Sequence, residues 1–254
     1  MNLAIVLASY NGATYIEDQI RSIQNQTIDA WKLYVRDDGS RDATVEVVAK
    51  LAAGDDRIIL LQDQLGNLGP VGNFSELMRV ALERGADYVA FADQDDIWLP
   101  EKLQVLLSEM QRQEEVCGQG DLLLVHSDLE VVNASLQTIH PSFIRLISVH
   151  PQEVDLGVLL CQNVVTGCAC MVNRELMNLA LPIPQGVLMH DWWLAQLAAA
   201  CGHIAYIDQA LIKYRQHGEN VVGAESYLKR VFKFSIMRSR QQKHIRVVLH
   251  RDRQ

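Results

Sequence analysis

Three carboxylates lie within four residues of one another, at Asp93, Asp95 and Asp96. They directly follow the apolar run from Tyr88 to Ala92, so they stand at the end of a predicted strand. Carboxylates this close repel one another unless a cation neutralises them. Oxygen ligands suit Mg²⁺ or Mn²⁺, which commonly joins carboxylates to the phosphates of a substrate. The pattern predicts such a metal site, and the alternative is a solvated acidic loop in which Asp96 caps the next helix.

Two other polar loops follow predicted strands. One runs from Ser9 to Gly12 and the other from Asp37 to Ser40. A carboxylate in the second loop can accept hydrogen bonds from a nucleotide base or a ribose, and Tyr10 can stack on a base. The alternatives are an ordinary turn for the second loop and simple packing at the edge of the sheet for Tyr10.

The elements that must position these loops alternate between strand and helix over the first hundred residues. An expected capping box, made by Thr14 and Glu17, starts the first helix. Strands joined by helices imply right-handed crossovers and a parallel sheet with helices on both faces. Ligands bind such sheets beyond the carboxyl ends of the strands, where all three polar loops lie. The predicted strands span 3–8, 32–36, 57–62 and 88–92, and the predicted helices span 14–26, 42–52 and 74–85.

The second half of the chain is less regular. It contains a strand-like segment at 122–125, a mixed apolar segment at 154–172 and a predicted helix from Asp191 to about Cys201. No linker separates the halves, so we expect one domain. The first strand is not followed by G-x-G-x-x-G, and G-x-x-x-x-G-K-[ST] is absent, which argues against a dinucleotide-binding fold and a P-loop.

Composition narrows the class of protein. The chain has 254 residues, of which 49% are hydrophobic and 21% charged, as expected for a folded globular protein. The sequence contains no run of eighteen apolar residues, so we expect no membrane-spanning helix. The first residues lack the basic and small-residue pattern of a secretion signal, so we expect a cytoplasmic protein. The five cysteines are expected to be buried thiols, because Cys168 and Cys170 have no second close pair to complete a zinc site.

Charge is distributed unevenly. The net charge is −8, but the segment 229–254 carries nine basic residues and one acidic residue, a net +8, which leaves −16 for the residues before it. The acidic body argues against a nucleic-acid partner. The basic segment mixes apolar and cationic residues, so we expect peripheral contact between 229–254 and an anionic membrane surface. A solvated helix and the start of a further module are the alternatives.

Taken together, the segments that contain these polar loops resemble the family 2 glycosyltransferases in their order and spacing. The segments are LASYNG, VRDDGSRDAT, NLGPVGNF and FADQDDIWLPEKL, followed by TGCACMVNREL, MHDWW and YRQHGENVVG. The form ADQDDIW resembles bacterial rhamnosyltransferase-like members. The resemblance implies an α/β fold of the GT-A type, with a mostly parallel central sheet and helices on both faces. It also implies a nucleotide-diphosphate sugar donor of the dTDP or UDP type, Mg²⁺ or Mn²⁺ as cofactor, and inversion at the anomeric carbon.

The same resemblance assigns the nucleotide and the metal to particular residues. Asp38 is expected to contact the base of the donor, in a pocket lined by Ala8 and Tyr10. Asp93 and Asp95 are expected to form the D-x-D motif, in which Asp93 contacts the nucleotide-sugar and the metal and Asp95 is the direct metal ligand.

The resemblance to the family also implies which residues take part in the transfer reaction. Asp191 matches the position of the catalytic base, although many members have Glu-Asp where this chain has His190 and Asp191. His217 belongs to a segment that closes over the donor in related enzymes. It is expected to touch the metal or the diphosphate, and the alternative is a loop histidine with a local hydrogen bond.

The expected protein is therefore an inverting, metal-dependent glycosyltransferase that moves a sugar, with rhamnose the candidate, to a growing bacterial surface polysaccharide on a lipid carrier. Its expected place is the cytoplasmic face of the inner membrane. We expect a glycosyltransferase domain over 1–228, with a nucleotide-binding half at 1–100 and an acceptor half at 101–228. A noncatalytic carbohydrate-binding or scaffold protein is the alternative, and a sugar-phosphate nucleotidyltransferase is the other enzyme class considered.

Overall fold

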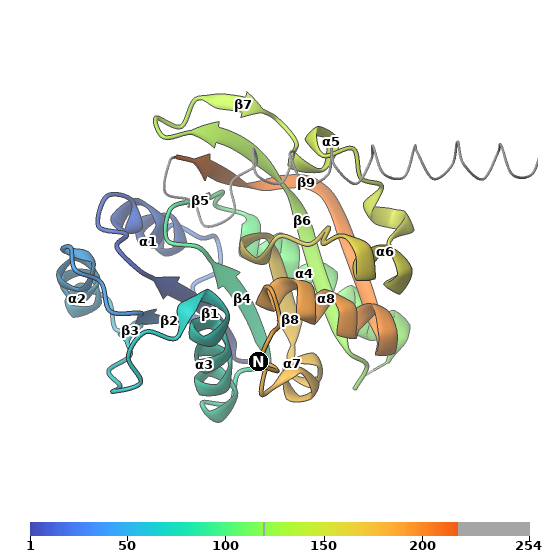
Figure 1. The fold of residues 1–254 in the computed structure, drawn as a ribbon, viewed down its shortest axis with the longest axis horizontal. Helices are drawn as coiled ribbons and strands as arrows, with labels where there is room; N and C mark the ends of the chain where they lie inside the picture. The colour runs from blue at the N-terminus through green and yellow to red at the C-terminus, as the bar shows by residue number, and fades with distance from the viewer. Residues whose placement is uncertain (119, 218–254) are drawn as a thin grey trace, which may run out of the picture.

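The computed structural model describes residues 1–118 and 120–217. The predictions made for the basic segment 229–254, and for the last residues of the expected domain 1–228, fall outside the described residues. Within them, strands from both halves of the chain join one nine-stranded sheet (Figure 1).

The first half of the chain follows the predicted alternation of strands and helices. Strands β1, β2, β3 and β4 are mutually parallel, in the order β3-β2-β1-β4. Their carboxyl ends therefore meet at one edge of the sheet, as the sequence predicts. The elements are β1 (Leu3–Ser9), α1 (Ile16–Gln24), β2 (Trp31–Asp37), α2 (Thr44–Gly54), β3 (Ile58–Leu60), α3 (Gly69–Glu83) and β4 (Tyr88–Ala92).

The predicted capping box at the start of α1 is wrong. The helix begins at Ile16, and the side chain of the N-cap residue, Tyr15, makes no capping hydrogen bond. The carbonyl oxygen of Gly12 instead accepts hydrogen bonds from the backbone N–H groups of Tyr15 and Ile16, each at 3.0 Å. Backbone groups of the polar loop therefore start the helix, which ties the loop to α1.

The second half adds antiparallel strands to the sheet. Strand β8 (Cys170–Asn173) lies antiparallel to both β4 and β6 (Leu123–Asn133), while β9 (His203–Gln216) runs parallel to β6. The complete order is β3-β2-β1-β4-β8-β6-β9-β5. The other elements are β5 (Ile97–Trp98), α4 (Lys102–Cys117), β7 (Thr138–His140), α5 (Phe143–Leu146), η1 (Pro151–Glu153), α6 (Leu156–Cys161), η2 (Gly167–Ala169), α7 (Arg174–Ala180) and α8 (His190–Cys201).

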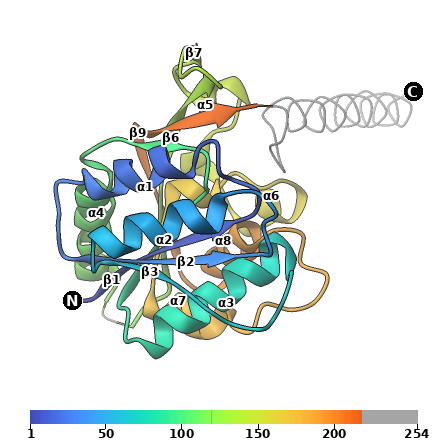
Figure 2. The ribbon, with the colours of Figure 1, turned by 90° about the vertical axis from the view of Figure 1, so that its left-hand side faces the viewer.

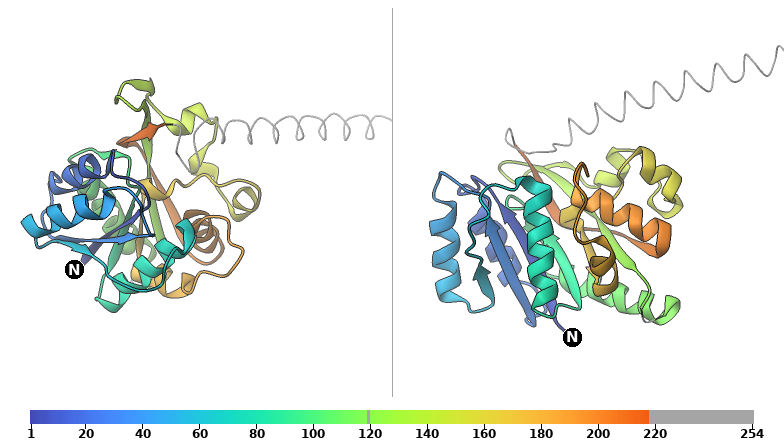
Figure 3. Two further views of the ribbon diagram at one scale, coloured as in Figure 1. Left: turned by 60° about the vertical axis from the view of Figure 1, so that its left-hand side comes forward. Right: turned by 60° about the horizontal axis from the view of Figure 1, so that its bottom comes forward.

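Helices cover both faces of the sheet, as predicted. Alternate residues of β1 point to opposite faces, so Ile5 packs in one core and Val6 in the other. The first core lies beneath α1, α2 and α4, and the second lies beneath α3, α7 and α8. Figure 2 shows the sheet between α4 and α3, and Figure 3 shows α2 and α3 on opposite sides of the first strands. The α/β fold with helices on both faces is confirmed.

Candidate active site

The carboxylate rim, which we define as Asp93, Asp95 and Asp96, lies at the carboxyl end of β4. Asp95 and Asp96 are buried and Asp93 is partly exposed. Poor solvation, together with the nearby Asp95 and Asp191 carboxylates, raises the pKa of Asp93 to about 7. Burial and the charges of its neighbours raise the pKa of Asp96 well above its usual range. The surroundings of the rim therefore disfavour the ionised forms of Asp93 and Asp96.

A divalent cation fits this rim. Oxygen atoms of Asp93 and Asp96 lie within 4.8 Å of each other and of the sulfur of Cys168. The Oδ2 atom of Asp96 is fully buried without a hydrogen-bond partner among the described residues. A set dominated by carboxylates suits Mg²⁺ or Mn²⁺ better than it suits a thiophilic metal. Crowded carboxylates with an unsatisfied buried oxygen are thus a donor set that a cation would complete.

The end of β9 closes over the rim. The Nε2 atom of His217 lies 2.7 Å from Oδ2 of Asp95, although 122 positions separate the two residues. Arg215 holds this end in place, because its backbone N–H donates to Asp96 at 3.0 Å and its Nε donates to the carbonyl oxygen of Asp95 at 2.8 Å. The His217 ring also packs on Tyr15, with 4.8 Å between ring centroids. The structure therefore brings His217 to the rim.

Asp191 lies in the first turn of α8, near enough to the rim for its charge to raise the pKa of Asp93. Its side chain is held from both sides, because Oδ2 accepts the N–H of Gly167 at 2.8 Å and Oδ1 accepts an N–H of Asn163 at 3.1 Å. The backbone N–H of Trp192 also donates to Oδ1, at 2.6 Å. Asp191 is only 7% exposed, and burial outweighs these bonds and raises its pKa to about 6. A carboxylate with this pKa is ionised at neutral pH and is a better base than an ordinary aspartate.

Gly167 makes this contact possible. A Cβ atom at position 167 would come within 2.9 Å of Nε2 of His190 and 3.3 Å of Oδ2 of Asp191. A side chain there would force the His190 ring to shift and would crowd the Asp191 carboxylate. The close approach of η2 to α8 therefore depends on glycine.

His190, beside the candidate base, points into the second core instead of the rim. Its ring stacks on Phe74, with 3.9 Å between centroids, and lies 5.2 Å from Phe91. Burial lowers the pKa of His190 to about 3, so the ring is neutral at physiological pH. Neither ring nitrogen has a hydrogen-bond partner among the described residues. This environment suits packing beneath Asp191 better than proton transfer.

The expected nucleotide residues lie around the ends of β1 and β2. Tyr10 is 47% exposed, and the Gln94 side chain holds its loop by bonding to the backbone N–H and carbonyl of Tyr10. Ala8 is partly exposed at the end of β1. Asp38 is buried, and its carboxylate accepts hydrogen bonds from Arg36 at 2.9 Å and from the backbone N–H groups of Leu68 and Gly69. The structure thus turns the Asp38 carboxylate toward the loop before α3.

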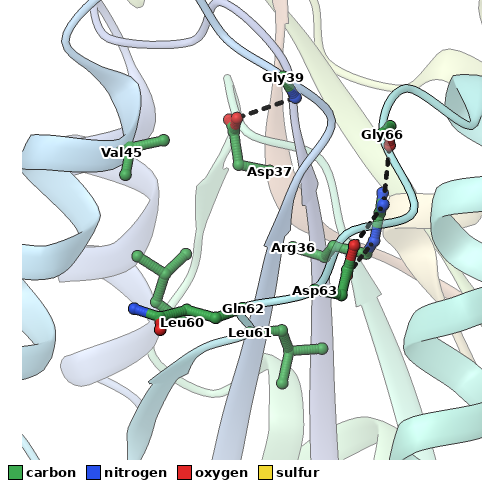
Figure 4. Close-up of a pocket in the computed structure, with 9 residues that line it drawn as sticks. All are labelled: Arg36, Asp37, Gly39, Val45, Leu60, Leu61, Gln62, Asp63 and Gly66. Atoms are coloured by element: carbon green, nitrogen blue, oxygen red, sulfur yellow. Dashed lines mark hydrogen bonds and ion pairs between the residues drawn. The ribbon is translucent and has the colours of Figure 1, made fainter.

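Arg36 organises a pocket of about 320 Å³ beside this loop. Arg36 is 1% exposed, and its guanidinium pairs with Asp63 at 2.8 Å and donates to the carbonyl oxygen of Gly66 at 2.9 Å. Figure 4 shows Arg36 reaching Asp63 and Gly66 while Asp37 turns back to Gly39. The pocket is lined by Arg36, Asp37, Gly39, Val45, Leu60, Leu61, Gln62, Asp63 and Gly66.

Several residues of this site were not predicted from the sequence: Arg36, Gln94, Lys102, Gly167 and Arg215. Arg36 and Arg215 lie within strands, where local patterns do not distinguish a buried ion pair from a solvent-exposed side chain. Gln94 stands within the acidic motif, which is its only signal in the sequence. These residues hold the loops rather than supply the expected chemistry.

Comparison with known proteins points to one family. The model of the family described as "Glycosyl transferase family 2" matches residues 4–133. The dTDP-rhamnosyl transferase RfbG of Shigella flexneri is 25% identical over 240 residues, covering 89% of this chain and 77% of its own length. An Escherichia coli protein, the UDP-Glc:alpha-D-GlcNAc-diphosphoundecaprenol beta-1,3-glucosyltransferase WfgD, is 30% identical over 177 residues. That match covers 69% of this chain and 62% of WfgD.

Solved structures share the fold at low sequence identity. The UDP complex of residues 1–349 of TarS from S. aureus superposes with a TM-score of 0.64 at 18% identity, covering 85% of this chain and 61% of that chain. The mannosyltransferase PcManGT of Pyrobaculum calidifontis, in complex with GDP-Man and Mn²⁺, superposes with a TM-score of 0.60 at 16% identity. It covers 92% of this chain and 64% of that chain. In both superpositions this chain spans less than two thirds of the length of the solved chain.

Proposed function

This chain belongs to glycosyl transferase family 2, and on that basis we propose that it is an inverting glycosyltransferase that uses a nucleotide-diphosphate sugar and a divalent cation. The observation that carries the proposal is the meeting of the carboxylate rim, His217 and Asp191 from three distant parts of the chain. Asp93 and Asp191 lie close enough for the charge of Asp191 to raise the pKa of Asp93. The residue that we propose as the base thus lies near the rim that we propose for the cation.

Asp93 and Asp95 would hold the cation, as Mg²⁺ or Mn²⁺, and His217 lies in reach of the same ion because it contacts Asp95. When bound, the cation stabilises the negative charge that develops on the departing nucleotide diphosphate. The acidic rim would otherwise repel that diphosphate. The contact of His217 with Asp95 orients the carboxylate.

Asp191 would act as the general base. The acceptor hydroxyl loses its proton to the Asp191 carboxylate as its oxygen forms a bond to the anomeric carbon of the donor sugar. The bond from that carbon to the diphosphate oxygen breaks, and attack opposite the leaving group inverts the configuration. Hydrogen bonds from Gly167, Asn163 and Trp192 fix the carboxylate before the acceptor arrives. Such orientation lowers the entropic cost of reaching the transition state.

The donor would bind along the ends of β1, β2 and β4. The exposed Tyr10 supplies a face on which the base can stack, and Ala8 and Asp93 lie beside it at the same edge of the sheet. For Asp38 we propose contact with the base, although its carboxylate is held by internal hydrogen bonds. Contact would require one of these bonds to be shared with the base or exchanged for it.

The relatives suggest the substrates. RfbG is a dTDP-rhamnosyl transferase, and the name of WfgD specifies a UDP-linked sugar and a diphosphoundecaprenol acceptor. A Campylobacter jejuni relative, 34% identical over 107 residues, is also named as a glucosyltransferase acting on a diphosphoundecaprenol-linked glycan. We therefore propose a dTDP or UDP donor, with rhamnose the first sugar to test, and a lipid-linked glycan acceptor from surface polysaccharide synthesis.

A lipid-linked acceptor would place the protein at the cytoplasmic face of the inner membrane. Among the described residues, none of the helices is both long enough and apolar enough to cross a bilayer. We propose peripheral contact through the basic segment 229–254, whose net charge of +8 favours anionic lipids. Flotation of the intact chain and of a chain ending at residue 228 with anionic liposomes tests this, and equal recovery of both would contradict it.

Metal-dependent nucleotide binding tests the core of the proposal. Calorimetric titration of UDP, dTDP and GDP into the protein, with and without Mn²⁺, is expected to show one preferred nucleotide that binds only with the metal. A noncatalytic carbohydrate-binding protein would show no such binding, and that result would contradict the proposal. A sugar-phosphate nucleotidyltransferase would instead release pyrophosphate from a nucleoside triphosphate, which a coupled assay detects.

A further inference from the structure

A lysine lies buried beneath the candidate site, and nothing in the proposed reaction uses it. Lys102 is the first residue of α4, and its side chain is fully buried. A buried lysine is costly unless its charge or its hydrogen bonds are satisfied. Burial lowers the pKa of Lys102 to about 7, against the attraction of nearby groups that include Asp96 and Asp93. A lysine buried in this way needs contacts that satisfy it.

The contacts of Lys102 supply that reason. Its Nζ donates a hydrogen bond of 2.7 Å to the carbonyl oxygen of Cys168, in the middle of η2. The same atom lies 3.1 Å from the ring centroid of the buried Trp98, a cation–π contact that fixes it from the other side. Lys102 thus fastens η2 to the start of α4 and to β5.

The turn that Lys102 fastens also holds the candidate base. Gly167, one residue before Cys168, donates its N–H to Oδ2 of Asp191 at 2.8 Å. The 3₁₀ turn is short. Its backbone is closed by hydrogen bonds from the N–H of Ala169 to the carbonyl oxygen of Thr166, at 2.9 Å, and from the N–H of Cys170 to the carbonyl oxygen of Gly167. A shift of Cys168 would therefore move the Gly167 N–H that orients the carboxylate.

We propose that Lys102 is a positioning residue for Asp191, which it orients through the turn formed by η2. Lys102 is not expected to touch substrate or to accept a proton in the reaction. Its role as a support for the base rests on the proposed function, whereas its role as an anchor of η2 does not. The path from Lys102 to Asp191 runs through the Cys168 carbonyl and the Gly167 N–H.

Hydrogen exchange of the metal-free protein without substrate tests the anchor. In Lys102→Met, amides of residues 164–170 are expected to exchange roughly tenfold faster, while those of β1 and β4 keep the wild-type rate. Lys32→Met is the matched control, because Lys32 also donates to a backbone carbonyl, that of Asp56 at 3.0 Å, but on the surface. Lys102→Gln keeps an N–H donor and is expected to fall between Lys102→Met and wild type.

Steady-state kinetics with the donor that wild type accepts tests the effect on the base. We expect Lys102→Met to lower kcat roughly 10- to 100-fold and to leave the KM for the donor within about twofold. Unchanged exchange at 164–170 in both Lys102 variants would overturn the inference, as would faster exchange throughout the fold, which would mark a general loss of stability. A wild-type protein inactive with every donor would overturn the proposed function and leave the anchor to be decided by exchange.

Discussion

His217 contacts Asp95 through a 2.7 Å approach of Nε2 to Oδ2, and this contact joins the end of β9 to the end of β4. The two residues are 122 positions apart, so only the folded sheet brings them together. The contact places an imidazole beside a carboxylate at the rim where we propose that a cation binds. It makes His217 a candidate for controlling how tightly metal and nucleotide are held.

Replacing His217 is therefore expected to weaken metal-dependent nucleotide binding. In His217→Ala, the affinity for the preferred nucleotide in the presence of Mn²⁺ should fall ~10- to 100-fold, because Asp95 loses the partner that orients it. Titration calorimetry measures this change. His203→Ala is the control, since His203 lies on the surface next to Asp121. Equal affinities for wild type and His217→Ala would show that the contact between His217 and Asp95 does not support nucleotide binding.

Removing the carboxylate of Asp191, the proposed base, should strongly reduce the rate of sugar transfer. Asp191→Asn keeps the size and the helix position of the side chain but removes the proton acceptor, so kcat is expected to fall ~10²- to 10⁴-fold. The KM for the donor should change little, because Asp191 is assigned to the acceptor hydroxyl. Initial rates measured with a saturating acceptor check both values. Transfer at the wild-type rate would exclude Asp191 as the base.

The pH dependence of the rate should report Asp191. Burial raises the pKa of its carboxyl to about 6, so the ionised, active form is lost as the pH falls through that value. We expect kcat to decline below about pH 6 and to be roughly tenfold lower at pH 5 than on the plateau. A rate profile from pH 4.5 to 8.5 at saturating substrates measures this limb. A flat profile down to pH 4.5 would contradict the assignment.

Arg36 should matter for stability far more than a surface arginine. Arg36→Met removes the positive charge that pairs with the buried Asp38 carboxylate. The free energy of unfolding is therefore expected to fall by about 3–5 kcal/mol. Arg79→Met is the control, because Arg79 pairs with Glu76 and Glu83 while half-exposed, and should cost less than about 1 kcal/mol. Urea unfolding measures both, and equal losses would show that the Arg36 cluster is not a structural centre.

Local sequence patterns were enough to predict the first half of the fold. Continuous apolar strands such as 88–92 and the spacing of Ile16, Ile20 and Ile23 on one helix face depend on neighbours in the chain. Because parallel strands end at one edge, the position of the carboxylate rim also followed. The capping box failed because Gly12 offered a backbone acceptor to the start of α1, which a side-chain rule does not consider.

The rest of the site depends on distant parts of the chain. Strand β9 pairs with β6 and β5, which lie far away in sequence, and its own residues mix apolar and polar side chains without a clear period. The burial of Arg215 and Lys102 is likewise set by tertiary packing, whereas their residue types predict exposure. The residues that we propose for the chemistry could therefore be named from the sequence, whereas the contacts that hold them could not.

The most direct test of the central claim is a panel of nucleotide-diphosphate sugars, assayed for released UDP, dTDP and GDP with the purified chain and Mn²⁺. We expect release from one donor type, loss of that release when EDTA removes the metal, and recovery when Mn²⁺ is restored. Release that persists in EDTA would contradict the metal-dependent mechanism. No release from any donor, with or without a glycan acceptor, would contradict the account as a whole.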